Sequence, residues 1–600
     1  MPRIKFFPSG ITAEAAEGEP LREAAARAGI EIEAPCGGEG TCGKCLVKII
    51  SGKLKTNGDF AFPPKKREAG FALACRASVC DVDAEVEIFS AGGDGRFAED
   101  EISEFVPPDE VSFLIKTLTL AVREPKAGDG FSDFDRLVSA VKNFVSFDGL
   151  RIPLPVLSAL PETLRASRTH TLVYYIESGI LQIVDLLPRD EIDFYGIAVD
   201  VGSTTVAACL VDKNGKAVAA RSEYNGQIIC GADVISRINY ARKGLHELRQ
   251  KIVETINALI NSLCEESGAD PSQIYHFSVA ANTTMVHLLL GINPEYIRLE
   301  PYVPAVYDPP LLTAGELGLS ANAAAPVYFA PSVGSYVGGD ITSGLLRLPP
   351  QSADEVNLFI DIGTNGEVVL CGGDFLIACA CSAGPAFEGG GISCGMRAAS
   401  GAVESVEIDA RTGEPRFSVI GGEAPKGICG SGMISLAAEL YRKGFLEPNG
   451  KFSGESKYIR EKKYFLSENI FITEQDMQNF IRAKAAVFSA CRTLLSGVGL
   501  SFGDLKNIFI AGGFGRYLNL GDAAEIGLIP PLPCEKYVYL SNSSLAGAYM
   551  TLVSENNRRL QAEIAKKITY TDLSAEPSYM DEYTAALFLP HTDGGLFKKN

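Results

Sequence analysis

The chain has 600 residues, of which 46% are hydrophobic and 22% charged, a composition typical of globular proteins with several domains. Its formal net charge of −19 argues against nucleic-acid binding, because phosphate backbones require a basic surface. No apolar run reaches the roughly eighteen residues that span a bilayer, and the N-terminal segment MPRIKFFPSG lacks the apolar stretch of a signal peptide. We therefore expect a cytoplasmic protein that binds neither membranes nor nucleic acids.

Four cysteines near the N-terminus form the first motif. The segment APCGGEGTCGKCLVKI at 34–49 has the spacing C-x5-C-x2-C, and a fourth cysteine follows in FALACRA at 71–77. A 2Fe–2S cluster needs four thiolates, and glycines in the ligand loop let backbone amides point at the sulfurs. The alternative is a zinc site on the same cysteines. Zinc ribbons favour two C-x2-C knuckles, whereas this motif contains a single one. The predicted cluster ligands are Cys36, Cys42, Cys45 and Cys75.

Residues 1–93 surround this motif with short strands of period two and one amphipathic helix. A strand, a helix and a second strand are expected before the first cysteine. The pattern favours a compact β-grasp domain that resembles 2Fe–2S ferredoxins. The spacing C-x5-C-x2-C has one residue more than the plant-type spacing C-x4-C-x2-C. For this reason the domain resembles the adrenodoxin-like branch of these ferredoxins. Cys80 lies in a predicted turn and is not expected to be a ligand.

The segment DGRFAEDEISEFVPPDE at 94–110 contains seven acidic residues and one arginine, and is predicted to be a flexible acidic linker. Residues 111–193 contain the apolar run VSFLIKTLTLAV, a helical stretch, and a hairpin, TLVYYIESGILQIVDLL, that turns at Gly179. We expect a small α/β domain here, and no motif in it indicates chemistry.

An internal repeat opens the C-terminal part, residues 194–600. GIAVDVGSTTVAACLVD at 196–212 and NLFIDIGTNGEVVLCGGD at 357–374 each contain an apolar strand that ends in aspartate, a short loop with glycine, and a second apolar strand. Backbone N–H groups and hydroxyls in such a loop can bind phosphate oxygens, and the aspartate can face a magnesium ion through its waters. The repeat therefore predicts two similar lobes that face a nucleotide cleft.

A glycine-rich segment, NIFIAGGFGRYLN at 507–519, completes this set, because a nucleotide base can lie against bare backbone. The order of the three segments resembles the actin-like ATPase superfamily, with its two-lobed, RNase H-like fold. Asp200 and Asp361 are expected to organise Mg²⁺ and to be catalytic. The residues expected to bind ATP are Gly202, Ser203, Thr204, Thr205, Gly363, Thr364, Asn365, Gly366, Gly512, Gly513 and Gly515.

The pairing of a ferredoxin with an actin-like ATPase resembles the reductive activators of corrinoid-dependent enzymes, over nearly the whole chain. Ala281 and Ser541 stand where that family leads us to expect glycine. Other segments similar to the family are NGQIICGADVISRI, NTTMVHLL, SYVGGDI, CSAGPAFEGGGI, KGICGSGMI and NSSLAGA.

The resemblance implies an enzyme that uses ATP to pass one electron from the 2Fe–2S cluster to the inactive Co(II) cobalamin of a corrinoid methyltransferase protein, which restores Co(I). It further implies an upstream low-potential electron donor and a homodimer. The segment CSAGPAFEGGGI at 381–392 is either a structural turn near the nucleotide or a nucleotide-responsive surface that exposes Ser382 and Glu388 to the corrinoid partner.

Three other functions remain open at this stage. The chain could activate a different redox enzyme, such as a dehydratase, although activators of that kind usually share one 4Fe–4S cluster across a dimer and lack a ferredoxin domain. It could be a small-molecule kinase with a ferredoxin appendage, which would need a catalytic base and a substrate pocket. It could also be a regulatory switch without ATP turnover.

Overall fold

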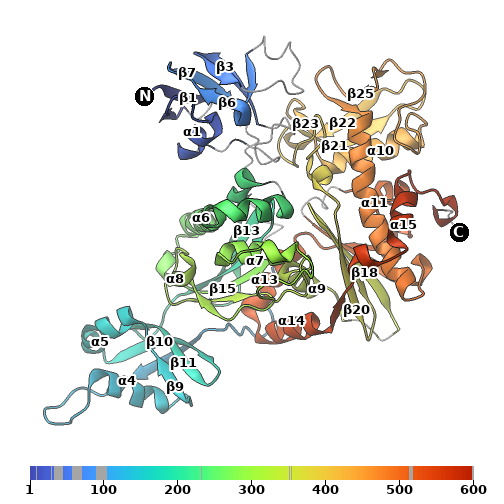
Figure 1. Cartoon of the computed structure of the whole chain (residues 1–600). Coiled ribbons are helices and arrows are strands. Elements are labelled where there is room, and N and C mark those ends of the chain that lie inside the picture. The colour runs from blue at the N-terminus through green and yellow to red at the C-terminus, as the bar shows by residue number, and fades with distance from the viewer. Residues whose placement is uncertain are drawn as a thin grey trace.

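The computed structural model describes residues 1–7, 10–28, 30, 32, 45–56, 70–88, 105–231, 233–350, 352, 354–512 and 518–597. Figure 1 shows an N-terminal unit in blue, a middle unit in cyan, and two lobes that run from green to red. Among the helices of these residues, none is both long and apolar enough to cross a membrane.

The N-terminal unit is a mixed five-stranded sheet in the order β2-β1-β7-β3-β5, with a separate β4–β6 ribbon. Buried residues alternate along its strands, and helix α1 places Leu21, Ala24 and Ala25 on the same core. A hairpin of β1 and β2 comes before α1, where a single strand was expected. The strand expected after α1 lies largely outside the described residues. The elements are β1 (Arg3–Phe7), β2 (Thr12–Glu14), α1 (Leu21–Arg27), β3 (Leu46–Ser51), β4 (Leu54–Thr56), β5 (Phe71–Leu73), η1 (Ala74–Arg76), β6 (Ala77–Val79) and β7 (Ala84–Ile88).

The middle unit is a four-stranded sheet in the order β8-β10-β11-β9, with two helices packed against it. The predicted hairpin is present as β10 and β11, and Gly179 has φ +80° at its turn. Half of VSFLIKTLTLAV, which spans 111–122, is the strand β8. The elements are β8 (Lys116–Ala121), α4 (Asp133–Lys142), β9 (Gly149–Arg151), α5 (Leu154–Ala166), β10 (Thr169–Glu177) and β11 (Ile180–Leu187).

Lobe 1 contains a six-stranded sheet in the order β14-β13-β12-β15-β17-β16. Its central strands are apolar along nearly their whole length because both faces are covered, with the long helix α6 in one of the two cores. The elements are β12 (Tyr195–Val201), β13 (Thr205–Asp212), β14 (Ala217–Tyr224), η2 (Gly226–Cys230), α6 (Val234–Ser267), η3 (Pro271–Gln273), β15 (Ile274–Ala281), α7 (Thr283–Leu290), η4 (Glu295–Ile297), β16 (Leu312–Thr313), α8 (Ala314–Leu317), β17 (Pro326–Phe329) and α9 (Gly339–Leu345).

Lobe 2 contains a second six-stranded sheet, in the order β28-β27-β18-β19-β20-β29. Two small three-stranded sheets sit on its outer end, next to α10 (Figure 1). The strands are β18 (Val356–Ile362), β19 (Gly366–Cys371), β20 (Leu376–Cys381), β21 (Ala402–Ile408), β22 (Pro415–Val419), β23 (Gly427–Ile428), β24 (Ile459–Arg460), β25 (Lys463–Phe465), β26 (Phe471–Thr473), β27 (Leu505–Ala511), β28 (Tyr537–Tyr539) and β29 (Ile568–Tyr570). The helices of this part of the chain are η5 (Pro385–Glu388), η6 (Ile420–Gly422), α10 (Gly430–Arg442), α11 (Glu474–Gly497), η7 (Phe502–Asp504), α12 (Leu520–Glu525), η9 (Cys534–Lys536), α13 (Ser543–Val553), α14 (Glu555–Lys567), η10 (Leu573–Ala575), α15 (Tyr579–Ala586) and η11 (Gly594–Phe597).

The two lobes share one strand plan, as the repeat predicts. Strand β12 is antiparallel to β13 and parallel to β15, and β18 is likewise antiparallel to β19 and parallel to β27. Asp200 and Asp361 hold equivalent places, each one residue before its strand ends and opposite the second strand of its hairpin. The plan brings both aspartates to the carboxyl ends of parallel strands, where open α/β sheets bind ligands.

The C-terminal part of the predicted linker packs on the rest of the protein, and its residues 94–104 lie outside the described residues. Phe105, which the sequence places inside it, is 9% exposed and packs on Tyr549 of α13 with 5.3 Å between ring centroids. An aromatic ring of this size is stable against an apolar face rather than in water. Although α13 follows lobe 2 in the sequence, Tyr549 shares a buried cluster with β12 and β13, so the chain at Phe105 packs against lobe 1. The N-terminal unit also touches lobe 1, because the Arg22 guanidinium of α1 donates to the Ile229 carbonyl.

Candidate functional site

A cavity of about 1230 Å³ lies between the lobes, where the two predicted phosphate loops meet. Ligand pockets commonly measure ~300–1,000 Å³, so a nucleotide fits. Gly366 packs against Cys381 away from the lining, and Gly513 and Gly515 lie outside the described residues. The predicted residues that line the cavity are Asp200, Gly202, Ser203, Thr204, Thr205, Asp361, Gly363, Thr364, Asn365 and Gly512.

The first phosphate loop, residues 200–205, is held from behind by two buried side chains. The Asn225 amide donates to the Gly202 carbonyl at 2.8 Å, and the Arg237 guanidinium donates to the Ser203 carbonyl. A Cβ atom on Gly202 would lie 2.6 Å from the Thr205 carbonyl oxygen, so the turn requires glycine. Both supporting residues come from the segment NGQIICGADVISRI, which the sequence singled out without a role.

Burial disfavours the charged form of Arg237, although the guanidinium stays protonated at neutral pH. This side chain is fully buried, and desolvation lowers its pKa to about 10. Its guanidinium also donates to the Gly231 carbonyl at 2.9 Å and to the Gln227 side-chain oxygen at 3.2 Å. These bonds fix the start of α6 to the first phosphate loop.

The second phosphate loop, residues 361–367, faces the first across the cavity. The Thr204 and Thr364 hydroxyl oxygens are 3.0 Å apart. The Glu388 carboxylate accepts from Thr204 at 2.7 Å and from Thr364 at 2.9 Å. The sequence placed Glu388 either in a structural turn near the nucleotide or on a surface exposed to the corrinoid partner. In the structure its carboxylate bonds to both phosphate loops, and its contact with a partner stays a prediction. Ser382 is exposed, and its predicted contact with a partner stays a prediction.

Four acidic side chains converge on the cavity. Burial raises the pKa of Asp200 to about 6, although Ser544 and Asn542 donate to its carboxylate at 2.8 and 3.0 Å. Burial and the Asp200 charge raise the pKa of Asp340 to about 7, and Asp361 reaches about 7 through burial and both neighbours. Burial and the charges of Asp340 and Asp361 raise the pKa of Glu367 well above its ordinary value. Carboxylates that repel one another in this way are suited to a bound cation.

A magnesium ion fits this donor set through its waters. Within the described residues, no three His, Cys, Asp or Glu side chains are grouped closely enough to form a ready-made metal cage. Mg²⁺ usually keeps several waters and is held by one or two carboxylates together with substrate phosphates. Asp200, Asp340 and Asp361, which line one cavity beside two phosphate loops, match that arrangement.

The far wall of the cavity carries two residues with unusual backbone. Gly512 has φ +117°, and a Cβ atom there would lie 2.3 Å from the Ile362 carbonyl oxygen. Ser541, where glycine was expected, has φ +53° and so adopts a left-handed conformation that favours glycine. Ala281, the other such position, ends β15 without a positive φ.

At the predicted cluster site, Cys45 and Cys75 lie together with 3.2 Å between their sulfur atoms. Cys45 stands just before β3 and Cys75 lies in η1, and the Ala74 amide donates to the Cys45 carbonyl at 2.8 Å. Cys36 and Cys42 lie outside the described residues. Two adjacent thiols fit a shared iron–sulfur ligand set, because thiolates bind such clusters.

The sequence missed Asp340, Asn225 and Arg237 as site residues. Asp340 follows the glycine pair of SYVGGDI, and a Cβ atom on Gly338 would lie 2.4 Å from the Asn282 Cα. This close approach brings α9 to the cavity. An acidic residue after two glycines was the available signal.

Comparisons with known proteins agree with this architecture. The model of a 2Fe-2S iron-sulfur cluster binding domain matches residues 4–80. The models of the RACo linker region, the RACo middle region and the C-terminal domain of RACo, the ASKHA domain, match residues 110–192, 195–349 and 355–600. The ferredoxin and actin-like fold classes predicted from the sequence are confirmed.

Two relatives and one solved structure are each similar to more than half of the chain. The corrinoid activation enzyme RamQ of Eubacterium limosum is 31% identical over 94% of this chain and 95% of its own. The [Co(II) methylated amine-specific corrinoid protein] reductase of Methanosarcina barkeri is 29% identical over 62% of this chain and 73% of its own. A solved structure, the reductive activator for corrinoid,iron-sulfur protein, is 40% identical with a TM-score of 0.74, and the match covers 100% of both chains.

Proposed function

Because this chain belongs to the family of reductive activators of corrinoid proteins, we propose that it returns the Co(II) cobalamin of a corrinoid methyltransferase protein to Co(I) with one electron from its 2Fe–2S cluster. ATP bound in the cleft between the lobes makes this step proceed. The observation that carries the proposal is the meeting of two phosphate loops and three aspartates in one cavity, on a chain that also pairs Cys45 with Cys75.

The electron balance requires a second partner. One electron leaves the reduced cluster and converts Co(II) to Co(I), so an upstream low-potential donor must reduce the cluster again. Plant-type clusters have potentials near roughly −400 mV, and the proposal places the corrinoid couple lower. A gap on the order of 100 mV costs about 2 kcal/mol for one electron, which nucleotide binding or hydrolysis can offset.

The protein groups of the cleft have distinct tasks in this proposal. The N–H groups and hydroxyls of the loops at 200–205 and 361–367 bind and orient the phosphates. Mg²⁺, when bound beside Asp200, Asp340 and Asp361, neutralises charge on the phosphate oxygens. Arg237 and Asn225 keep the first loop in place from behind.

ATP turnover in the presence of candidate partners tests the proposal. Hydrolysis by the purified protein should be slow alone and faster with a Co(II) corrinoid protein. Strong stimulation by a sugar or a carboxylic acid, with none by corrinoid protein, would favour a small-molecule kinase instead.

The homodimer implied by the resemblance is a separate expectation. Sedimentation of the cluster-loaded protein tests it.

A further inference from the structure

We propose that Glu388 is a latch that senses the γ-phosphate of ATP. Its carboxylate holds the two phosphate loops together without nucleotide, and the γ-phosphate takes over its two hydroxyl partners and releases it. ADP, which lacks this group, leaves the latch closed. This inference rests on the proposed function and adds to it the residue that distinguishes ATP from ADP.

The hydrogen bonds of Glu388 join residues of different lobes. Thr204 donates to one carboxylate oxygen at 2.7 Å and Thr364 donates to the other at 2.9 Å. Each hydroxyl can donate one hydrogen bond. When both hydroxyls donate to the carboxylate, neither can donate to the other. The carboxylate is therefore the group that keeps two hydroxyl oxygens 3.0 Å apart across the cleft.

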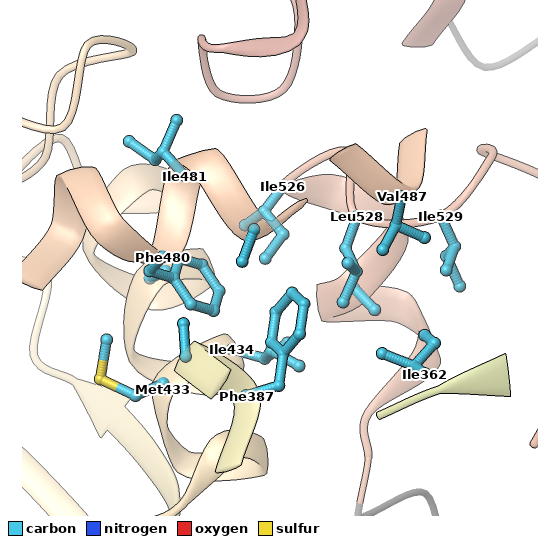
Figure 2. Packing of buried hydrophobic residues seen from close by; sticks show 14 of the residues in the cluster. Ile362, Phe387, Met433, Ile434, Phe480, Ile481, Val487, Ile526, Leu528 and Ile529 are labelled. Carbon is cyan, nitrogen blue, oxygen red and sulfur yellow. The ribbon is translucent and has the colours of Figure 1, made fainter. Parts of the chain in front are cut away.

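The residue before the latch anchors it in lobe 2. Phe387 is 1% exposed and meets Phe480 of α11 edge to face, with 5.7 Å between ring centroids. Figure 2 shows both rings inside the hydrophobic cluster of lobe 2, which also contains Ile362 of the second phosphate loop. Because its neighbour is fixed in the core, the Glu388 side chain reaches the cleft from a rigid base.

The chain that follows the latch crosses to lobe 1 a second time. The Arg397 guanidinium lies over the Tyr224 ring, 4.2 Å from its centroid, and both residues line the cavity. The segment 388–397 thus begins and ends in contacts between the lobes. Release of Glu388 removes one of these two attachments, so the segment becomes less protected.

A γ-phosphate between the loops competes directly with Glu388. Phosphate and carboxylate oxygens are both negatively charged acceptors, and they require the same two hydroxyl donors. ATP must therefore displace the carboxylate, which lowers its apparent affinity. By reciprocity, whatever opens the latch makes ATP bind more tightly.

Two variants of the full, cluster-loaded chain test the latch. Glu388→Ala removes the carboxylate, and Glu388→Gln keeps one acceptor oxygen but removes the charge. Both should bind a non-hydrolysable ATP analogue more tightly than wild type, about fivefold or more for Glu388→Ala, while ADP affinity changes less than about twofold. Glu407→Gln, on the exposed side of β21 in the same lobe, is the matched control and should change neither affinity.

Hydrogen exchange of the segment 388–397 gives a second readout. In wild type, the ATP analogue should raise exchange in this segment and ADP should not. In Glu388→Ala, exchange should be high without nucleotide, and the analogue should add little. Cluster absorbance and far-UV circular dichroism confirm that each variant is folded.

The latch and the proposed function fail in different ways. If the variants bind ATP and ADP in the wild-type ratio but still support Co(I) formation, the latch is wrong and the proposed function stands. A loss of turnover at unchanged ATP affinity would make Glu388 a base in hydrolysis and would also overturn the latch. If the wild-type chain binds neither nucleotide, both are wrong.

Discussion

The hydroxyl oxygens of Thr204 and Thr364 lie 3.0 Å apart, although the two residues are 160 positions apart in the sequence and belong to different lobes. The contact shows that the two phosphate loops face each other across one cavity, as a duplicated hairpin plan requires. Ligand binding between them must therefore act on both lobes at once, and the following predictions test parts of this arrangement.

The cluster cysteines give the first prediction. Cys75→Ala should abolish the cluster, because Cys75 lies 3.2 Å from Cys45 in the predicted ligand set. Cys80→Ala is the control and should keep it. Anaerobically prepared wild type should contain two irons and two sulfides and show a rhombic spin-half signal after one-electron reduction, as elemental analysis and electron paramagnetic resonance can establish. Stoichiometric zinc without iron would contradict the assignment.

The support behind the first phosphate loop gives the second. Arg237→Met should destabilise the protein and weaken ATP binding, because each buried carbonyl left without its donor costs about 1–3 kcal/mol. Arg242→Met is a matched control on the same helix, since Arg242 forms a half-exposed ion pair with Glu295 that is worth about 1 kcal/mol or less. Urea unfolding and nucleotide titration measure both effects. Equal losses in the two variants would show that Arg237 does not support the loop.

The acidic cluster gives a pH dependence. Asp340 and Asp361 have pKa values of about 7 in the folded protein against 3.8 ordinarily. Between these values the folded state binds more protons than the unfolded state, so stability without metal should fall as pH rises towards 7. Mg²⁺ binds the ionised carboxylates and must displace any protons that they hold. Below pH 7 its affinity should therefore fall about tenfold per pH unit for each proton displaced. Calorimetric melting with and without Mg²⁺ at pH 6 and pH 8 tests this. A smaller stabilisation by Mg²⁺ at pH 8 than at pH 6 would contradict it.

Periodicity and local motifs predicted much of the fold. The alternation in DAEVEIF, the turn at Gly179 and the two aspartate-loop hairpins each depend on residues close in sequence, and the structure has all three. Phe105 was misplaced because its acidic neighbours dominate the composition of the segment. Its packing partner Tyr549 lies in a helix near the other end of the chain, and no local pattern encodes that contact.

The site was predictable where glycine and aspartate share one loop, as at 200–205 and 361–367. Asp340 and Arg237 were missed because they belong to helices outside the loops: Asp340 lines the cavity from α9, and Arg237 of α6 supports the first phosphate loop from behind. The contact of Glu388 with both phosphate loops could not be predicted, because the direction of its side chain depends on the burial of Phe387 against Phe480, which is a tertiary contact. Long-range packing therefore explains each of these gaps.

Coupling between the cleft and the electron transfer is the central claim, and Asp361→Asn tests it most directly. The change removes a carboxylate from the proposed magnesium site and keeps the shape of the residue, whereas Asp200→Asn also alters the bonds from Asn542 and Ser544. Asp374→Asn, in the exposed turn between β19 and β20, is the matched control.

The measurement follows cluster and cobalamin absorbance together, with and without Mg–ATP, after an external reductant is added to the protein and a Co(II) corrinoid protein. The account predicts that Asp361→Asn and Asp200→Asn keep a normal, reducible cluster but fail to accumulate Co(I), and that Asp374→Asn behaves as wild type. If either cleft variant converts Co(II) to Co(I) as fully as wild type, the cleft does not couple ATP to electron transfer.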